Sequence, residues 1–190
     1  MNLLCLDLEL NQPSGKVIEV GALVFKSNDK GKLQIVDEMQ VFVNPLEPIA
    51  MDITLLTGIT NVDVARGTSV YEAYLDLRNM HKKHKCFKNC LVWGSGAYSD
   101  SSHLWDQVVS EGHLPSMLLE EGNTFGRRVL DVKTLYQSRQ IINGKTVKGG
   151  LSVACKELEL DFIGEPHRAK PDAINTARVF LELMKKDVAK

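Results

Sequence analysis

The stretch Leu3-Leu4-Cys5-Leu6-Asp7-Leu8-Glu9 determines how the rest of the chain is interpreted. It predicts a short apolar strand into which two carboxylates have been placed. Side chains alternate between the two faces of a strand, so Asp7 and Glu9 point one way while the alternating leucines point the other. Two acids on one face of a sheet repel each other and are costly to bury unless a cation neutralises them. The pattern therefore predicts either a metal site or a solvent-facing edge strand with ordinary surface acids.

Length and composition indicate one globular domain covering residues 1–190. Of the 190 residues, 44% are hydrophobic and 25% are charged, which suits a single sizeable core. With a net charge of −1, the chain lacks the overall positive charge of a sequence-reading DNA-binding domain. Nucleic acid is not excluded as a substrate, because bound divalent cations can supply local positive charge. No apolar run approaches membrane-spanning length, so we expect a soluble, cytoplasmic protein with no membrane partner.

Apolar periodicity predicts an N-terminal group of strands followed by alternating helices and strands. Residues 3–9, 17–25 and 33–43 form the three strands of an expected antiparallel meander. Two shorter strands are expected at residues 91–93 and 127–130. Helices are expected at residues 52–60, from residue 69, and at residues 99–111, 132–140 and 151–160. The last helix is expected to begin at Pro171. The fold class is therefore α/β, a mixed sheet of about five strands flanked by helices.

One group of histidines and cysteines has the residue types of a zinc site. It comprises His81, His84, Cys86 and Cys90. The spacing is cramped, and the group straddles a predicted helix end and the next strand. We therefore favour solvated helix-end residues and a core cysteine over a zinc site.

Two later segments place polar residues where the chain enters a helix. Asp100 follows a buried strand and the small-residue turn 94–97, at a predicted helix start. Asp172 falls in the first turn of the last predicted helix, and His167 lies just upstream on a loop. Each residue alone has a plain structural alternative, because first-turn acids suit the helix dipole and lone histidines are usually structural or solvated.

Taken together, the acids of these segments can form a metal site. The four carboxylates are Asp7, Glu9, Asp100 and Asp172. They suffice to hold two divalent cations with open positions for water and phosphate oxygens, and oxygen-only ligation favours Mg²⁺ or Mn²⁺ over zinc. His167 is the candidate general base, because histidine changes charge near neutral pH. Asp131 is the main competitor to Asp100, and Asp106 is a lesser one; the glycine-rich turn favours Asp100.

Several short motifs occur in the order and at the separations of a known family. Asp7-Leu8-Glu9 is similar to its first motif, and residues 93–100 with Leu104 are similar to the second motif of one bacterial and phage branch. His167 to Asp172 has the H-x4-D spacing of the third. Residues 56–59 and 128–131 are similar to a helix and a strand of the family. In these features the chain resembles, from Leu3 to about Leu183, the DEDDh 3′→5′ exonucleases. These form the DnaQ-like superfamily, with a ribonuclease-H-like fold, of proofreading subunits, RNase T and oligoribonuclease.

This resemblance implies a two-metal-ion 3′→5′ exonuclease. Such an enzyme hydrolyses single-stranded nucleic acid, DNA or RNA, from its 3′ end to nucleoside 5′-monophosphates. Two Mg²⁺ or Mn²⁺ ions are implied, with Asp7 bridging both, Glu9 and Asp172 on the nucleophile side and Asp100 on the far side. His167 is the implied general base. Family members occur as monomers and dimers, so a homodimer is also open.

The implied substrate contacts come from Leu10, Leu56 and Thr57, by analogy with residues that wedge or stack against terminal bases in the family. Core packing is an open alternative for both leucines. The chain departs from the family where Leu10 and Asn11 follow Glu9, since Thr is frequent there, and where Lys170-Pro171 replaces a more usual apolar-acidic pair. The shape of the wedge and the path of the His167 loop are therefore open.

The most basic segment contains Arg127, Arg128, Lys133, Arg139, Lys145 and Lys148. It either tracks a phosphate backbone or forms a solvated helix face. Two other functional classes compete with the nuclease. A catalytically inactive nuclease fold that binds nucleic acid or protein is expected to lack an acid or the histidine, yet all five are present. A phosphatase with an aspartyl nucleophile needs a second Asp where this chain has Glu9.

Overall fold

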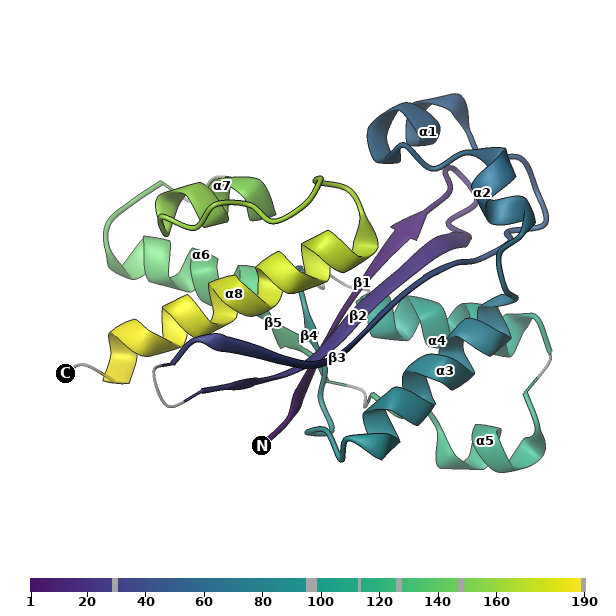
Figure 1. Cartoon of the computed structure of the whole chain (residues 1–190), viewed down its shortest axis with the longest axis horizontal. Helices are drawn as coiled ribbons and strands as arrows, with labels where there is room; N and C mark the ends of the chain where they lie inside the picture. Colours follow the sequence, from purple (N-terminus) through teal and green to yellow (C-terminus); the bar gives the residue numbers. More distant parts are fainter. Residues whose placement is uncertain (29–30, 95–98, 113, 126–127, 147–148, 189–190) are drawn as a thin grey trace.

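The computed structural model describes residues 1–28, 31–94, 99–112, 114–125, 128–146 and 149–188. Within these ranges the strands form one mixed sheet in the order β3-β2-β1-β4-β5 (Figure 1). The fold is the ribonuclease-H-like α/β fold that the sequence predicts.

The first half of the sheet is an antiparallel meander, as predicted. It consists of β1 (Leu3–Leu10), β2 (Val17–Ser27) and β3 (Leu33–Phe42). The two short strands β4 (Leu91–Val92) and β5 (Leu130–Asp131) continue the sheet on the other side of β1 and run parallel to it. The carboxyl ends of β1, β4 and β5 therefore lie along one edge of the sheet, where polar residues following each strand can meet.

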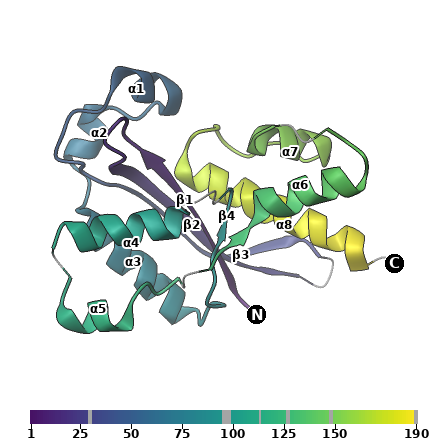
Figure 2. The ribbon, with the colours of Figure 1, turned by 180° about the vertical axis from the view of Figure 1, so that it is seen from behind.

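Helices cover both faces of this sheet. They are α1 (Met51–Thr57), α2 (Asn61–Ala65), α3 (Val70–Lys83), α4 (Asp100–Ser110), α5 (Ser116–Glu121), α6 (Val132–Ile142), α7 (Leu151–Glu157) and α8 (Ala169–Val188). In both views α6, α7 and α8 lie on one side of the sheet, and α3, α4 and α5 lie on the other (Figures 1 and 2). The short helices α1 and α2 lie beyond the carboxyl end of β1. No described helix combines the length and the apolar character needed to cross a bilayer.

The central strand β1 separates two hydrophobic cores. Leu4, Leu6 and Leu8 are buried in the core beneath α3 and α4, whereas Cys5 is buried in the core beneath α8. Fully burying one leucine side chain stabilises a fold by about 1.5–3 kcal/mol. Slipping β1 by one residue would exchange its two faces and drive its acids into the leucine core, so this burial fixes the register. The predicted alternation of β1 is confirmed.

Some predicted boundaries are wrong. Helix α8 begins at Ala169 rather than at Pro171. A proline near the start of a helix costs no hydrogen bond, because the first four N–H groups have no acceptor within the helix. Strand β5 covers residues 130–131 rather than 127–130, of which residue 127 lies outside the described ranges.

Two helices were not predicted, and both are short. A capping box between Thr60 and Asp63 starts α2, which has only five residues. Helix α5 has six residues, lacks a side-chain cap and ends at Gly122. Neither is long enough to display a clear helical period, which explains why the sequence pattern does not reveal them.

Candidate active site

Three acids converge where α8 crosses β1. Asp7 and Glu9 project from the face of β1 that α8 covers, and Asp172 lies in the first turn of α8. One carboxylate oxygen from each residue lies within 4.8 Å of the others. Residues far apart in the sequence are therefore brought together by the packing of the last helix on the first described strand.

The side chain of Asp172 is oriented by the loop that precedes its helix. Its Oδ2 accepts a hydrogen bond of 3.3 Å from the backbone N–H of His167. Its Oδ1 is buried, and no hydrogen-bond partner for it lies among the described residues. A buried carboxylate oxygen without a donor is costly, which makes Oδ1 a candidate ligand atom for a cation.

The electrostatics of the site oppose full ionisation of these acids. Burial, followed by the charges of Asp100, Asp172 and Glu9, raises the pKa of Asp7 well above its ordinary value. Burial and the charge of Asp172 raise the pKa of Glu9 to about 8. Burial raises the pKa of Asp172 to about 6, although the N–H of His167 partly offsets this effect. Without added positive charge the site cannot hold all its carboxylates in the ionised form.

Asp100 is close enough to contribute to the same field. It is the first residue of α4, after the N-cap Ser99, whose hydroxyl accepts the N–H of Ser102. Burial raises the pKa of Asp100 to about 7, and its charge is the largest of the neighbouring charges that raise the pKa of Asp7. It is not part of the close triplet formed by the other three acids. The glycine-rich turn at residues 95–98 lies outside the described ranges.

The two competitors to Asp100 have other surroundings. The Asp131 carboxylate accepts the N–H of Gly94 and the N–H and hydroxyl of Thr134, at 3.1, 3.1 and 2.8 Å. Asp131 therefore caps α6 and ties the end of β4 to the end of β5. Asp106 is exposed on α4. Asp131 is occupied as a helix cap and Asp106 faces solvent, so Asp100 remains the favoured fourth acid of the site.

His167 lies at the rim of the site, on the loop that enters α8. Its side chain is exposed, and its backbone has φ 61°, in the left-handed region that non-glycine residues rarely adopt. Such strain persists where surrounding contacts hold it and is frequent at functional positions. The imidazole is thus accessible to water, while its backbone is tied to the Asp172 carboxylate.

The three predicted substrate contacts differ in exposure. Leu56 on α1 is 52% exposed, whereas Leu10 at the end of β1 is half-buried against the core beneath α3 and α4. Thr57 is buried, and its hydroxyl donates to the Ile53 carbonyl at 2.8 Å and accepts the Ile59 N–H at 3.1 Å. The Thr57 side chain therefore supports the end of α1 and is not presented to a substrate.

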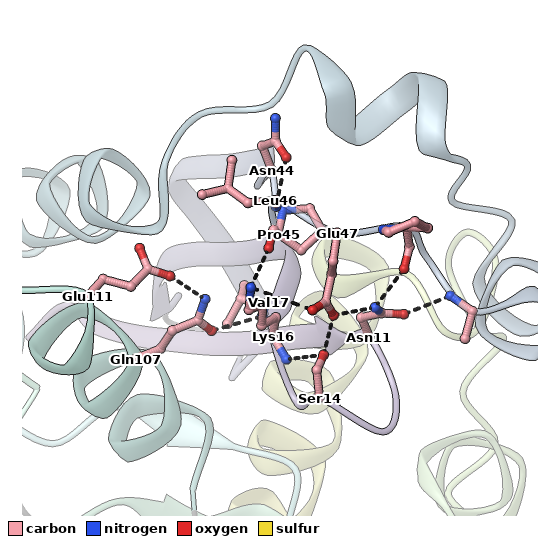
Figure 3. A network of polar contacts seen from close by, with 12 residues as sticks. Asn11, Ser14, Lys16, Val17, Asn44, Pro45, Leu46, Glu47, Gln107 and Glu111 are labelled. Atoms are coloured by element: carbon pink, nitrogen blue, oxygen red, sulfur yellow. Dashed lines mark hydrogen bonds and ion pairs between the residues drawn. The ribbon is translucent and has the colours of Figure 1, made fainter.

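A polar network fixes the position of α1 relative to β1 (Figure 3). The buried Asn11 amide donates to Glu47 Oε1 at 2.7 Å and to the Pro48 carbonyl at 3.1 Å, and its oxygen accepts the Ala50 N–H at 2.9 Å. Ser14 also donates to Glu47. Asn11, which departs from the family pattern, thus fastens the segment that leads into α1 and positions Leu56 near the end of β1.

The side chains at this edge fit a divalent cation of the magnesium class. All the candidate ligands are carboxylates, and hard cations such as Mg²⁺ and Mn²⁺ prefer oxygen ligands. The unpartnered Asp172 oxygen and the raised pKa values of the acids are both relieved by positive charge.

The histidines and cysteines considered for zinc have other partners. His81 Nε2 lies 3.2 Å from the Phe87 carbonyl, and His84 Nε2 lies 2.7 Å from Asp37 Oδ2. Cys90 is buried in the leucine core. Their contacts are those of helix-end and core residues.

The described members of the basic segment have different surroundings. Arg139 donates to the Leu183 carbonyl of α8 at 2.7 Å, and Arg128 borders a hollow with Lys88 and Glu121. The Lys133 side chain lies against Gly94, next to the site edge. Residues 127 and 148 lie outside the described ranges. A continuous phosphate track along this segment is therefore not supported.

One acid next to the site was missed by the sequence reasoning. Glu19 on β2 is fully buried and pairs directly with Glu9 across the hairpin. A lone acid in the apolar run of β2 was the available signal, and the hairpin register would have placed it beside the candidate ligands.

Comparison with known proteins agrees with this geometry. A family model described as "Exonuclease", RNase_T, matches residues 4–180. The DNA polymerase III PolC-type of Ureaplasma parvum serovar 3 is 28% identical over 166 residues, which cover 87% of this chain and 10% of that protein. The chain therefore spans about a tenth of the length of that relative.

Solved structures share the fold at low sequence identity. The nuclease domain of 3′hExo, a DEDDh family member bound to rAMP, matches with a TM-score of 0.75 and 18% identity over 97% of this chain and 92% of that chain. Cell-death related nuclease 4 matches with a TM-score of 0.73 and 14% identity over 97% and 64% of the two chains. E. coli Exonuclease I in complex with a dA16 oligonucleotide matches with a TM-score of 0.66 and 10% identity over 97% and 40%.

Proposed function

Because the chain belongs to the RNase T exonuclease family, we propose that it is a metal-dependent 3′→5′ exonuclease of the DnaQ-like DEDDh type. Its proposed substrate is single-stranded nucleic acid, DNA or RNA, and its proposed products are nucleoside 5′-monophosphates.

One observation carries this proposal. Carboxylate oxygens of Asp7, Glu9 and Asp172 lie within 4.8 Å of one another, and one Asp172 oxygen is buried without a described donor. A cluster of half-buried acids with raised pKa values destabilises a fold unless positive charge compensates it, and ligation of divalent cations is the chemistry that fits it. We assign Asp100 to the same site as the more distant acid.

The chain supplies the following parts of the reaction. Two Mg²⁺ or Mn²⁺ ions, when bound, would contribute positive charge that polarises the scissile phosphate and stabilises the negative charge developing on the attacking water and on the departing 3′ oxygen. Asp7, Glu9, Asp100 and Asp172 are the proposed ligands. His167 is the proposed general base, because its exposed imidazole can accept the proton of the attacking water.

We place the 3′ end of the nucleic-acid strand beside α1. The exposed Leu56 side chain offers an apolar surface on which a terminal base can pack, and Leu10 lies where β1 ends. Packing of a base face against an aliphatic side chain does not read the hydrogen-bonding edge of the base, so we expect a nuclease with little sequence preference. The 3′hExo structure contains rAMP and the Exonuclease I structure contains dA16, so related folds accept both kinds of sugar.

The test is nucleotide release from matched strands. Short RNA, long RNA and single-stranded DNA, each labelled at its 3′ end, are incubated with Mg²⁺, with Mn²⁺ or with chelator. We expect labelled mononucleotide with metal and none with chelator. Asp7→Asn is expected to lower the rate by at least about 10³-fold, because it removes a ligand from a metal site. Asp106→Asn on the exposed face of α4 is the matched control and should act like the wild type.

Other outcomes would assign the chain to a different class. Binding of the strand without release of label in any metal would indicate a catalytically inactive nuclease fold. Release of the 3′ label only after the strand has been degraded from its 5′ end, or on an oligonucleotide produced by internal cleavage, would contradict the proposed direction.

A further inference from the structure

The buried carboxylate of Glu19 is fully occupied by donors. Its Oε1 accepts Arg168 Nη2 and Gln40 Nε2 at 2.7 and 2.8 Å. Its Oε2 accepts Arg168 Nε and the Ala169 N–H at 3.2 and 2.8 Å. Four donors saturate the two oxygens of a carboxylate. Glu19 lies opposite Glu9 in the sheet, but both of its oxygens accept hydrogen bonds from the protein. They are therefore not available as ligands for a cation.

The donors that Glu19 binds lie immediately after His167. Arg168 forms a two-point contact with the carboxylate and also lies 5.5 Å from the centre of the Phe42 ring. Such a fork fixes the guanidinium in both position and orientation. The next residue, Ala169, is held through its backbone N–H. The last residue of the loop and the first residue of α8 are therefore fastened to β2.

The other side of His167 is fixed by α8. The His167 N–H donates to Asp172 Oδ2, and the Asp172 N–H donates to the Arg168 carbonyl at 3.0 Å. The His167 backbone thus lies in its left-handed conformation between a contact to a candidate ligand and a contact to Glu19. Its imidazole remains exposed, so the backbone contacts determine where that ring is presented.

We propose that Glu19 and Arg168 are positioning residues for His167. The Glu19 carboxylate holds Arg168 and Ala169 so that the backbone of His167 presents its imidazole to the water at the acid cluster. This inference rests on the proposed nuclease function, and it assigns neither residue to metal or substrate. Misplacing a catalytic group by about 1 Å can cost about 10²-fold in rate, so the effect should be large even though neither side chain takes part in the chemistry.

A double-mutant cycle tests this role. Turnover is measured on a 3′-labelled single strand for the wild type, Arg168→Lys, His167→Ala and the double variant. Arg168→Lys keeps the charge but loses the fork, and we expect it to lower kcat by about 10–100-fold while KM stays within about twofold. In the His167→Ala background the same substitution should have less than about a twofold effect, because the group it positions is gone.

Two measurements separate positioning from general loss of structure. Mn²⁺ affinity should be unchanged in Arg168→Lys. Amide hydrogen exchange of residues 165–172 should become faster than in the wild type. Lys170→Ala is the matched control, because Lys170 belongs to the same segment but only pairs with the exposed Glu38 at 3.1 Å. It should leave kcat and exchange near wild-type values. Glu19→Gln, which keeps the shape but weakens the fork, should resemble Arg168→Lys if it folds.

The outcomes distinguish the two proposals. If the wild type releases no nucleotide, the nuclease function and this role both fail. If the wild type is active but the effects of Arg168→Lys and His167→Ala multiply, Arg168 acts independently of His167 and the positioning role is wrong. Loss of Mn²⁺ affinity in Arg168→Lys would likewise contradict it.

Discussion

At the scale of single residues, the alternation of β1 is the feature that the sequence predicts most directly. The leucines of one face pack into a hydrophobic core, and because side chains alternate along a strand, the acids lie on the other face. The structure confirms this division. Asp172 was also accessible to prediction, because Pro171 indicates a nearby helix start and so places Asp172 in a first helical turn. The position of Glu19 had a signal in the lone acid of β2, but its role did not, because its partners Arg168 and Ala169 lie near the far end of the chain.

His167→Ala separates the roles of base and ligand. We expect kcat to fall by about 10²–10⁴-fold, because a positioned acid–base group contributes on that order. Mn²⁺ affinity, measured by titration calorimetry, should change less than about twofold because His167 is not among the clustered oxygen ligands. His84→Ala, which removes only a contact to Asp37, is the control and should keep full activity. Lost Mn²⁺ binding in His167→Ala would identify a ligand instead of a base.

At the scale of elements, the close packing of α8 on β2 sets the geometry of the site. Gly21 lies directly across from Asp7, and a Cβ added to it would be 2.1 Å from the backbone of Ala169 and Lys170. Only glycine permits α8 to approach this closely, and that approach brings Asp172 to the acids of β1. The sequence showed the strand and the helix but could not show that they touch. Pro171 suggested a helix start two residues too late. The true start at Ala169 is stabilised by the contact of its N–H with Glu19, and a tertiary contact cannot be seen in the local sequence.

Gly21→Ala should displace the start of α8. Overpacking at a close contact costs about 1–3 kcal/mol or more, and a shift of Asp172 should lower kcat by about 10²-fold or more. Thermal unfolding and nucleotide release measure the two effects. Gly150→Ala is the control, since Gly150 caps α7 and a Cβ added to it would have no atom of the described residues within 4 Å. A Gly21→Ala protein with wild-type turnover would show that the site does not depend on this contact.

At the scale of the whole molecule, the candidate site weakens the metal-free fold. In an unfolded chain, carboxyl groups ionise with pKa values near 4. In the folded protein the pKa is about 6 for Asp172, about 7 for Asp100 and about 8 for Glu9. The folded state thus retains protons that the unfolded state has released, so the stability that is fully present below about pH 4 declines above it and is lost as the pH rises through the folded pKa values of about 6 to 8.

We therefore expect the melting temperature in chelator to fall between pH 5.5 and 8.5, by several degrees for each kcal/mol lost. Glu9→Gln removes one of the groups and should flatten this decline. Mn²⁺ should raise the melting temperature more at pH 8 than at pH 5.5. Mn²⁺ and protons compete for the same carboxylates, so Mn²⁺ binds more tightly when fewer protons are bound. The measurement is thermal unfolding across this pH range. An identical pH dependence in wild type and Glu9→Gln would contradict the assignment.

The distance along the chain between the two halves of the site has a consequence for synthesis. Asp7 emerges from the ribosome 165 positions before Asp172, which reaches its place when α8 docks on β1. A growing chain therefore displays a sheet with two acids but no assembled cation site. The proposed activity is therefore expected to appear only after α8 has been made and has docked on β1.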